Sequence, residues 1–234
     1  MHPQLHAAFD IPVPLDASLK KQEELFSRSS RECGEHFILF AEHEPVYTFV
    51  QGKMPNSRLF RNGGGPSSLR APLVPLRRPG SITYHGPGQL VCYFIFDLKT
   101  AQIGVFDFND AIEMSVIEML ASFNIQGTPK PAHLPQEASG VWVKRSDGIA
   151  RKIASRGLHY SPEHGSTRFG CAINLSTDLS WFDPIFPCGL DIQMTSVEKE
   201  ASVVPSVRSA AHLLFKFFCE NFNHFFQKEK RRSN

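Results

Sequence analysis

Residues 77–90 read RRPGSITYHGPGQL, a run of three glycines, two prolines, two arginines and one histidine that neither a helix nor a regular strand favours. Glycine relieves the steric limits on φ and lets a ligand or a second chain approach the backbone, while proline stiffens turns. Ile82–Tyr84 predict a short strand entering the turn, and Leu90–Leu98 predict a mostly apolar strand leaving it. We therefore expect His85 at a loop between two sheet elements, where functional residues tend to lie.

The residues before this stretch predict a helix, two strands and a long loop. Residues 15–30 predict a helix with a polar face. Glu35–Phe49 predict an apolar strand, a histidine-rich turn and a second short strand. Residues 51–72 show no periodicity and contain a run of glycine, proline and serine at positions 63–68. We expect a surface loop there, and loops of this length inside a compact domain are usually functional or mobile.

The residues after the glycine-rich stretch predict further strands and two helices. Asp107 is expected to cap a helix from Phe108 to about Phe123, whose apolar residues share one face. Asp147-Gly148 is a turn signal between two extended segments. The strands of that hairpin, a further strand, a closing loop and a last helix are predicted at Gly140–Lys144, Lys152–Tyr160, Phe169–Leu175, Trp181–Gly189 and Ala201–Gln227.

Length and composition are those of an ordinary globular protein. The 234 residues, 41% hydrophobic and 21% charged, predict one domain over residues 1–234 with a core from about 30 to 227. A formal charge of +2 gives no reason to expect a nucleic acid partner. Five cysteines without short paired spacing suit a reducing compartment and free thiols better than disulfides or a zinc site. The basic residues Lys228, Lys230, Arg231 and Arg232 are expected to form a solvated end.

The sequence carries no membrane or secretion signal. No apolar run approaches the roughly 20 residues needed to cross a bilayer, so no membrane association is expected. The N-terminal residues lack a basic start followed by an apolar core, which argues against secretion. They also carry too many acids and too few arginines for a clear transit peptide, so import into an organelle stays open.

Two residues could carry chemistry from their surroundings alone. Cys188 lies between Pro187 and Gly189, where its sulfur is approachable and a neighbouring amide could stabilise an oxyanion. The alternative is a buried, inert thiol. Lys152 follows a polar hairpin turn, and a lysine directed into an apolar pocket could lower a thiol pKa and move protons. The alternative is that Lys152 points to solvent.

Other sites have weaker support. His43 lies between Glu42 and Glu44 and follows His36, but strand alternation would send these side chains to opposite faces, so no metal site is predicted. The sequence contains no glycine-rich phosphate loop ending in Lys-Ser/Thr and no G-x-G-x-x-G after a strand. Readings as an ATP-binding or NAD-binding protein therefore lack support.

Seven blocks, taken in order, resemble the lipoyl(octanoyl) transferase family over about residues 37–200. The combination of TYHGPGQ with a downstream PCG is specific for that family. The blocks are EHEPVYTF (Glu42–Phe49), TYHGPGQL (Thr83–Leu90), SGVWV (Ser139–Val143), KIASRG (Lys152–Gly157), FGCAINLSTDLSWF (Phe169–Phe182), PCGL (Pro187–Leu190) and MTSVEKE (Met194–Glu200).

The resemblance implies an α/β (α+β) fold, a mixed sheet with packed helices, like the catalytic domain of biotin and lipoate protein ligases. It implies transfer of an octanoyl group from octanoyl-acyl carrier protein to a lysine of lipoyl domains, the first step of lipoate biosynthesis. Acceptors would be the 2-oxoacid dehydrogenase complexes and the glycine cleavage H protein. No metal or other cofactor is implied.

By position, Cys188 matches the family's nucleophile, which carries the acyl chain as a thioester, and Lys152 matches the lysine that activates it. A thioester donor and a thioester intermediate are close in free energy, so this transfer needs no ATP. An acyl tunnel would gain about 0.8 kcal/mol for each buried methylene. The family's substrate-binding segments correspond to Arg78, Pro79, Gly80, Ser81, Ile82, Thr83, Tyr84 and His85, to Ser155, Arg156 and Gly157, and to Gly170, Cys171 and Ala172.

Three departures from the family touch these segments. The family usually has Arg-Gly-Gly at Arg78-Pro79-Gly80, a small or apolar pair at Ser155-Arg156 and His-Gly at Phe169-Gly170. A charge at Arg156 facing an acyl tunnel would be costly unless it pairs with an acid or turns to solvent.

Other functions stay open. A catalytically degenerate homologue could bind lipoyl domains or acyl carrier protein without transfer. The same pocket could serve an ATP-dependent ligase or an amidotransferase that moves lipoate between proteins, whereas a thiol hydrolase lacks its usual triad spacing. Residues 169–185 look more like eukaryotic family members, which favours a mitochondrial location; a bacterial protein would be cytoplasmic.

Overall fold

The computed structural model describes residues 4–29, 35–52 and 55–232, and a seven-stranded sheet organises them. β1 and β2 run parallel, and the other neighbouring pairs run antiparallel, so the sheet is mixed, as predicted. In spatial order its strands are β1 (Gln4–Val13), β2 (Glu35–His43), β6 (Gln89–Ile95), β12 (Gly170–Asn174), β9 (Ala150–Arg156), β8 (Gly140–Lys144) and β7 (Gly127–Thr128).

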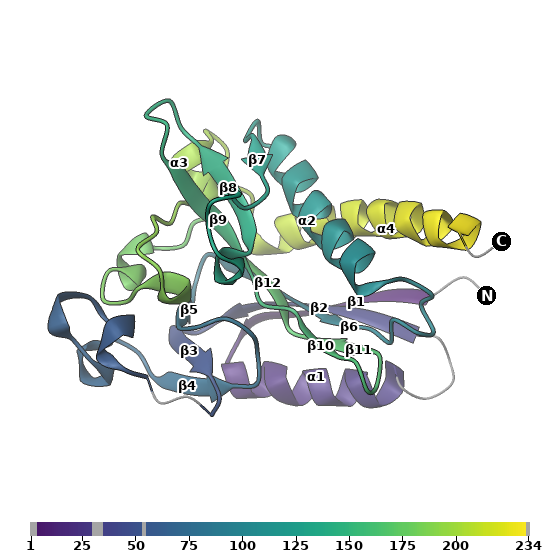
Figure 1. Ribbon diagram of the computed structural model, residues 1–234, viewed down its shortest axis with the longest axis horizontal. Coiled ribbons are helices and arrows are strands. Elements are labelled where there is room, and N and C mark those ends of the chain that lie inside the picture. The colour runs from purple at the N-terminus through teal and green to yellow at the C-terminus, as the bar shows by residue number, and fades with distance from the viewer. Residues whose placement is uncertain (1–3, 30–34, 53–54, 233–234) are drawn as a thin grey trace.

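Helices cover both faces of this sheet (Figure 1). α1 (Leu15–Ser29) packs on one face, and α2 (Val105–Ala121) and α4 (Val207–Arg232) pack on the other. In β2, Ile38 and Phe40 join the core under α2 and α4, whereas Phe37 and Leu39 join the core under α1. A strand buried on both faces reads as a continuous apolar run, which explains why the sequence predicted β2 and β6 so clearly.

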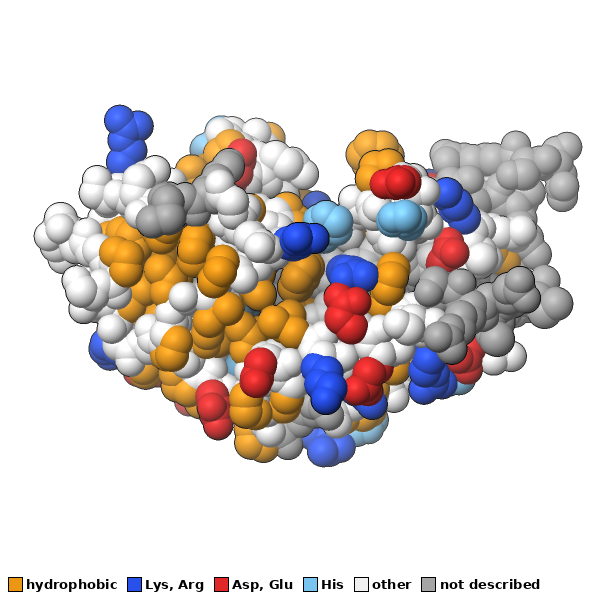
Figure 2. All heavy atoms as spheres, turned by 90° about the horizontal axis from the view of Figure 1, so that it is seen from below, with side chains coloured by type: hydrophobic (Ala, Val, Ile, Leu, Met, Phe, Trp, Pro, Cys, Tyr) orange, Lys and Arg blue, Asp and Glu red, His pale blue; other side chains and the backbone are white. Residues whose placement is uncertain are grey.

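A small three-stranded sheet lies beside the main sheet, at the left of Figure 1. It orders β4 (Leu73–Leu76), β3 (Val46–Val50) and β5 (Thr83–His85). Hydrophobic side chains gather over this end of the molecule in Figure 2, while charged side chains dominate over α1. The long loop predicted before β4 is confirmed, and it contains three short 3₁₀ turns, at Ser57–Leu59, Arg61–Gly63 and Pro66–Ser68.

Several predicted boundaries were wrong. β1 was missed. α2 begins at Val105 after Gly104, so Asp107 lies in the first turn instead of capping the helix. The strand predicted at Lys152–Tyr160 ends at Arg156, and β10 (His159–Ser161) pairs instead with β11 (Ser166–Arg168). The last helix begins at Val207 because Pro205 cannot continue a helix; a separate turn, α3 (Val197–Glu200), precedes it.

Two further observations concern the described residues as a whole. None of their helices has the length and apolar character needed to cross a membrane. None of their His, Cys, Asp and Glu side chains gather in a group of three that could hold a metal ion. Cys33 and the side chains of Lys230, Arg231 and Arg232 lie outside the described residues.

Candidate active site

A narrow void, here called the central cavity, lies on the α1 side of the main sheet and has a volume of about 60 Å³. Its floor is formed where Val91 of β6, Ala172 of β12 and Ser155 of β9 stand opposite one another. Small side chains at these positions leave the void open. Its roof is the segment 78–83, which leads from β4 into β5.

Cys188 lines this cavity, and Lys152 contacts its sulfur. Cys188 lies in a 3₁₀ turn, Pro187–Gly189, and has a left-handed φ of 60°. Lys152 of β9 is fully buried, and its Nζ lies 3.3 Å from Cys188 Sγ. Burial lowers the pKa of Lys152, and the nearby Cys188 opposes that shift. A buried amine with a lowered pKa is suited to accept and return a proton at neutral pH.

The prediction that an amide beside Cys188 is free to stabilise an oxyanion was wrong. Cys188 N–H donates to the Ile82 carbonyl at 3.0 Å, and Gly189 N–H donates to the Phe186 carbonyl at 2.8 Å. The tight turn therefore uses both amides to close its own backbone and to hold the roof, and neither is free for an oxyanion.

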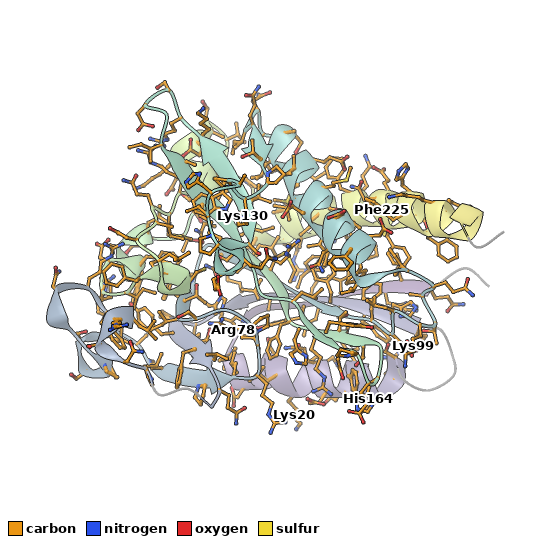
Figure 3. The ribbon with its side chains drawn as sticks, in the orientation of Figure 1. Lys20, Arg78, Lys99, Lys130, His164 and Phe225 are labelled. Atoms are coloured by element: carbon orange, nitrogen blue, oxygen red, sulfur yellow. The ribbon has the colours of Figure 1, made fainter. Side chains whose placement is uncertain are left out.

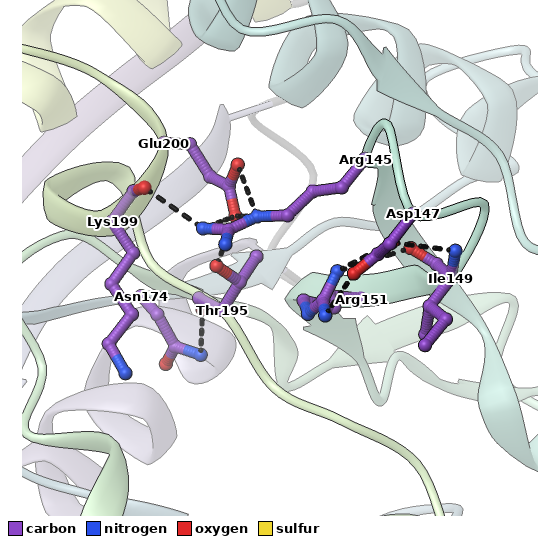
Figure 4. A network of polar contacts seen from close by, with 8 residues as sticks. All are labelled: Arg145, Asp147, Ile149, Arg151, Asn174, Thr195, Lys199 and Glu200. Atoms are coloured by element: carbon purple, nitrogen blue, oxygen red, sulfur yellow. Dashed lines mark hydrogen bonds and ion pairs between the residues drawn. The ribbon is translucent and has the colours of Figure 1, made fainter.

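A polar network supports the backbone of Lys152, and Figure 4 shows its members Arg145, Thr195 and Glu200. The Lys152 carbonyl accepts from Thr195 N–H at 2.9 Å. The Thr195 hydroxyl donates to Glu200 of α3, whose carboxylate also forms an ion pair of 2.9 Å with Arg145. This network connects α3 to the β8–β9 hairpin and fixes the strand that carries the amine.

Arg78 points into the space between the small sheet and the main sheet (Figure 3). Its guanidinium donates to the carbonyl and the hydroxyl of Thr48, both at 2.8 Å, and to the Ser81 carbonyl at 2.8 Å. Burial lowers the pKa of Arg78 to about 10. The cation thus holds the roof to β3 through neutral oxygens.

His85 is oriented by a chain of side chains. Its Nδ1 lies 2.7 Å from Gln89 Oε1, and Gln89 Nε2 donates to Asn174 Oδ1 at 2.9 Å. Asn174 Nδ2 donates to the Thr195 carbonyl at 3.0 Å. An amide oxygen only accepts, so this arrangement assigns the proton to His85 Nδ1. Burial lowers the pKa of His85 to about 3, which keeps the ring neutral.

Arg156 does not direct its charge into the cavity. Alternation along β9 turns its side chain to the opposite face, where its guanidinium lies 3.5 Å from the Glu113 carboxylate of α2. It also donates to the Asn109 carbonyl at 3.3 Å. Burial raises the pKa of Glu113, and Arg156 opposes that rise. The condition stated for a charge at this position, pairing with an acid, is therefore met.

The structure brings nearly all the predicted substrate-binding residues together. Tyr84 is the exception: it alternates with its neighbours along β5 and stacks on Trp181 in the small-sheet core, with ring centroids 5.0 Å apart. The side chain of Cys171 turns to the α2 and α4 face. The predicted residues that line the cavity are Arg78, Pro79, Gly80, Ser81, Ile82, Thr83, His85, Ser155, Arg156, Gly157, Gly170, Cys171, Ala172 and Cys188.

Sequence reasoning missed other residues of the cavity wall: Leu76, Val91, Cys92, Tyr93 and Glu137. Period-two alternation along β6 could have indicated Val91 and Tyr93. Tyr93 hydroxyl and His43 Nε2 lie 2.7 Å apart, and the other ring nitrogen of His43 lies 3.2 Å from the Val13 carbonyl. This pairing makes His43 the acceptor and Tyr93 the donor.

A second and larger void, the outer cleft, has a volume of about 1040 Å³. It lies between α1, the end of β4 and the β10–β11 turn, and Lys20 and His164 mark two of its sides in Figure 3. Leu76 and Phe169 line both the outer cleft and the central cavity.

The sequence of the chain is similar to those of known proteins. The lipoyl protein ligase A/B catalytic domain matches residues 15–219. The octanoyltransferase of Bacteroides thetaiotaomicron is 36% identical over 194 residues, which are 80% of this chain and 82% of that relative. The octanoyltransferase of Pseudomonas fluorescens is 35% identical over 189 residues, covering 80% of this chain and 79% of that relative.

Solved structures share the fold. Lipoate-protein ligase A bound with ATP aligns with a TM-score of 0.68 at 14% identity, over 95% of this chain and 86% of the other. Biotin protein ligase from Aquifex aeolicus, in complex with biotin and ATP, aligns with a TM-score of 0.51 at 12% identity, over 96% and 72%. The predicted likeness to these ligase catalytic domains is confirmed, and the sequence matches give the family: the chain belongs to the lipoyl(octanoyl) transferases within the lipoyl protein ligase A/B catalytic domain family.

Proposed function

We propose that this protein transfers an octanoyl group from a thioester donor to a protein lysine through a covalent thioester on Cys188. Octanoyl transfer is the activity of its curated relatives. The single observation that carries the mechanism is the buried Lys152 amine, 3.3 Å from the sulfur of Cys188, which lines the central cavity.

In the first half-reaction the neutral Lys152 amine takes the proton of the Cys188 thiol. The thiolate attacks the carbonyl carbon of the donor thioester, and a new carbon–sulfur bond forms as the donor's bond breaks. The departing thiolate takes the proton back from the Lys152 ammonium. One thioester replaces another, so the step is near balance and requires no nucleotide.

In the second half-reaction the amine of the acceptor lysine attacks the Cys188 thioester. The amide bond forms, Cys188 leaves as a thiolate, and the proton lost by the attacking amine passes through Lys152 to that sulfur. Conversion of a thioester to an amide runs downhill and supplies the direction of the overall transfer.

The central cavity suits the acyl chain. Val91, Ala172 and the small Ser155 form its floor, and each methylene buried there contributes about 0.8 kcal/mol of binding. Because Arg156 pairs with Glu113 across the sheet, the cavity receives no unpaired charge from that position.

We propose octanoyl-acyl carrier protein as the donor and lipoyl domains, including those of the 2-oxoacid dehydrogenase complexes and the glycine cleavage H protein, as acceptors. We also propose that the chain forms one catalytic domain. The relatives named above are bacterial, so the mitochondrial location suggested by residues 169–185 stays a prediction, which fractionation of the source cells tests.

The first experiment mixes the purified protein with octanoyl-acyl carrier protein and no acceptor, and measures intact mass. The expected result is a gain of one octanoyl group that hydroxylamine removes and that Cys188→Ser does not acquire. Addition of a lipoyl domain should then move the group to its lysine without ATP. If the wild type stays unmodified while a bacterial octanoyltransferase is loaded in parallel, the binding-only homologue is the better account.

A further inference from the structure

Phe169 stands between the two voids of the molecule. It lines the central cavity and the outer cleft, a position that it shares with Leu76 of β4. Its ring packs on Tyr93 of the cavity wall with centroids 6.3 Å apart. These side chains therefore form the partition between the central cavity and the outer cleft.

The backbone of Phe169, which places the ring between the two voids, has an unfavourable conformation. Its φ is 60°, in the left-handed region that residues with a side chain rarely occupy. The Phe169 carbonyl accepts from Phe94 N–H at 2.7 Å, and its N–H donates to Gln22 Oε1 of α1 at 3.2 Å. The neighbouring elements thus impose this conformation, and such outliers are concentrated at functional sites.

The partition lies at the end of the cavity away from the sulfur. β9 and β12 pair antiparallel with Ser155 opposite Ala172. Lys152 and Phe169 each precede that pair by three residues on strands of opposite direction, so they lie on opposite sides of it. An acyl chain that starts on Cys188 beside Lys152 and follows the cavity floor would meet Phe169 at its far end.

We infer that Phe169, together with Leu76, closes the far end of the central cavity and limits the length of the acyl chain that Cys188 carries. The inference rests on the proposed function for the acyl substrate, but the geometry concerns any alkyl chain attached to this sulfur. Without the ring, the cavity would open into the outer cleft, and a longer chain would find room to be buried.

The test labels the protein with octyl and dodecyl methanethiosulfonate, which attach alkyl chains to thiols without any transferase chemistry. Initial labelling rates at Cys188 are read by intact mass, with Cys188→Ser as the blank for other thiols. Phe169→Ala should raise the dodecyl-to-octyl rate ratio on the order of tenfold or more, because further methylenes become buried. Phe169→Trp should lower the octyl rate.

Phe26→Ala is the matched control, since Phe26 is also partly buried against the same core and lines the outer cleft but not the central cavity. Its ratio should stay at the wild-type value. An unchanged ratio in Phe169→Ala, or an equal change in Phe26→Ala, overturns the inference. Phe169→Leu, which keeps an apolar side chain at the site, supplies the same comparison should the alanine variant fail to fold.

The same variants are then assayed with octanoyl- and dodecanoyl-acyl carrier protein. A parallel shift of the transfer ratio toward dodecanoyl supports both proposals. If no variant transfers an acyl group from either donor while alkyl labelling still shifts in Phe169→Ala, the proposed function fails and the inference on the partition stands.

Discussion

The amine of Lys152 lies where water has been excluded, and this location determines what it can do. An exposed lysine would hold its proton at neutral pH, whereas burial lowers the pKa of this one, and the sulfur 3.3 Å away is the group with which it can exchange a proton. The reactivity of Cys188 therefore depends on a neighbour that is distant in sequence.

Replacement of Lys152 by methionine tests this dependence. Met keeps the length of the side chain and removes the exchangeable proton, so octanoyl loading of Cys188 should fall by about 10²–10⁴. Folding should persist, because methionine replaces a buried polar amine with an apolar group of similar length. Single-turnover loading and chemical denaturation measure the two quantities. Loading at the wild-type rate in this variant would remove Lys152 from the mechanism.

The local sequence around Cys188 and Lys152 left their roles open. Only the resemblance to the family predicted that the two side chains act together. The structure brings them together for a reason no local pattern contains: β9 and the turn at Pro187–Gly189 are placed by separate parts of the fold. The ion pair between Arg156 and Glu113 could not be predicted either, because Glu113 lies on α2, far from Arg156 in the sequence.

Among the elements, β9 contributes the largest share of the side chains discussed at the site: Lys152, Ser155 and Arg156. One of its faces presents Ser155 to the central cavity, which Gly157 directly after the strand also lines, and the other face directs Arg156 to α2. The strand was predicted from the turn signal at Asp147-Gly148 that precedes it, but its end was not, because this signal says nothing about the change of direction at Gly157. β1 was missed because a strand at the edge of a sheet is only partly buried and carries a weaker apolar signal.

Two substitutions of Gly157, directly after this strand, test how much space lies between the floor and the roof of the central cavity. A Cβ at Gly157 would lie 3.7 Å from the Pro79 carbonyl oxygen and 3.9 Å from Arg78 Cδ, in ordinary contact with the roof. Gly157→Ala should therefore load octanoyl at close to the wild-type rate. Gly157→Val places further atoms where the chain would lie, and should lower loading about tenfold or more, since overpacking costs roughly 1–3 kcal/mol. Equal rates in the two variants would mean that the chain binds elsewhere.

For the molecule as a whole, three histidines with lowered pKa values contribute to its response to acid. Burial lowers the pKa values of His36 and His43 from 6.5 to about 4, and that of His85 to about 3. Between these values and 6.5 the unfolded chain binds more protons than the folded chain. The free energy of unfolding should therefore rise with pH across this window and decline as the pH falls below 6.5.

His36 allows this behaviour to be dissected. Its ring is fully buried and stacks on Phe96 with centroids 4.9 Å apart, and neither ring nitrogen has a hydrogen-bond partner among the described residues. His36→Phe should raise the free energy of unfolding at pH 5 and flatten its slope. The pKa shift from 6.5 to about 4 corresponds to roughly 3 kcal/mol in full, of which about 2 kcal/mol is reached at pH 5. Urea denaturation at pH 7, 6 and 5 measures the effect. A slope identical to that of the wild type would contradict it.

The hydrogen bond from Cys188 N–H to the Ile82 carbonyl limits which substitutions can change the substrate preference of the protein during evolution. Because the proposed nucleophile is tethered by this hydrogen bond to the roof of the proposed acyl site, any displacement of that roof carries the sulfur with it. The width of the cavity and the distance between Cys188 and Lys152 therefore change together. A substitution that widens the site by moving the roof must also shift the sulfur relative to Lys152, whereas one in the floor can alter the preferred chain and leave the reacting pair undisturbed.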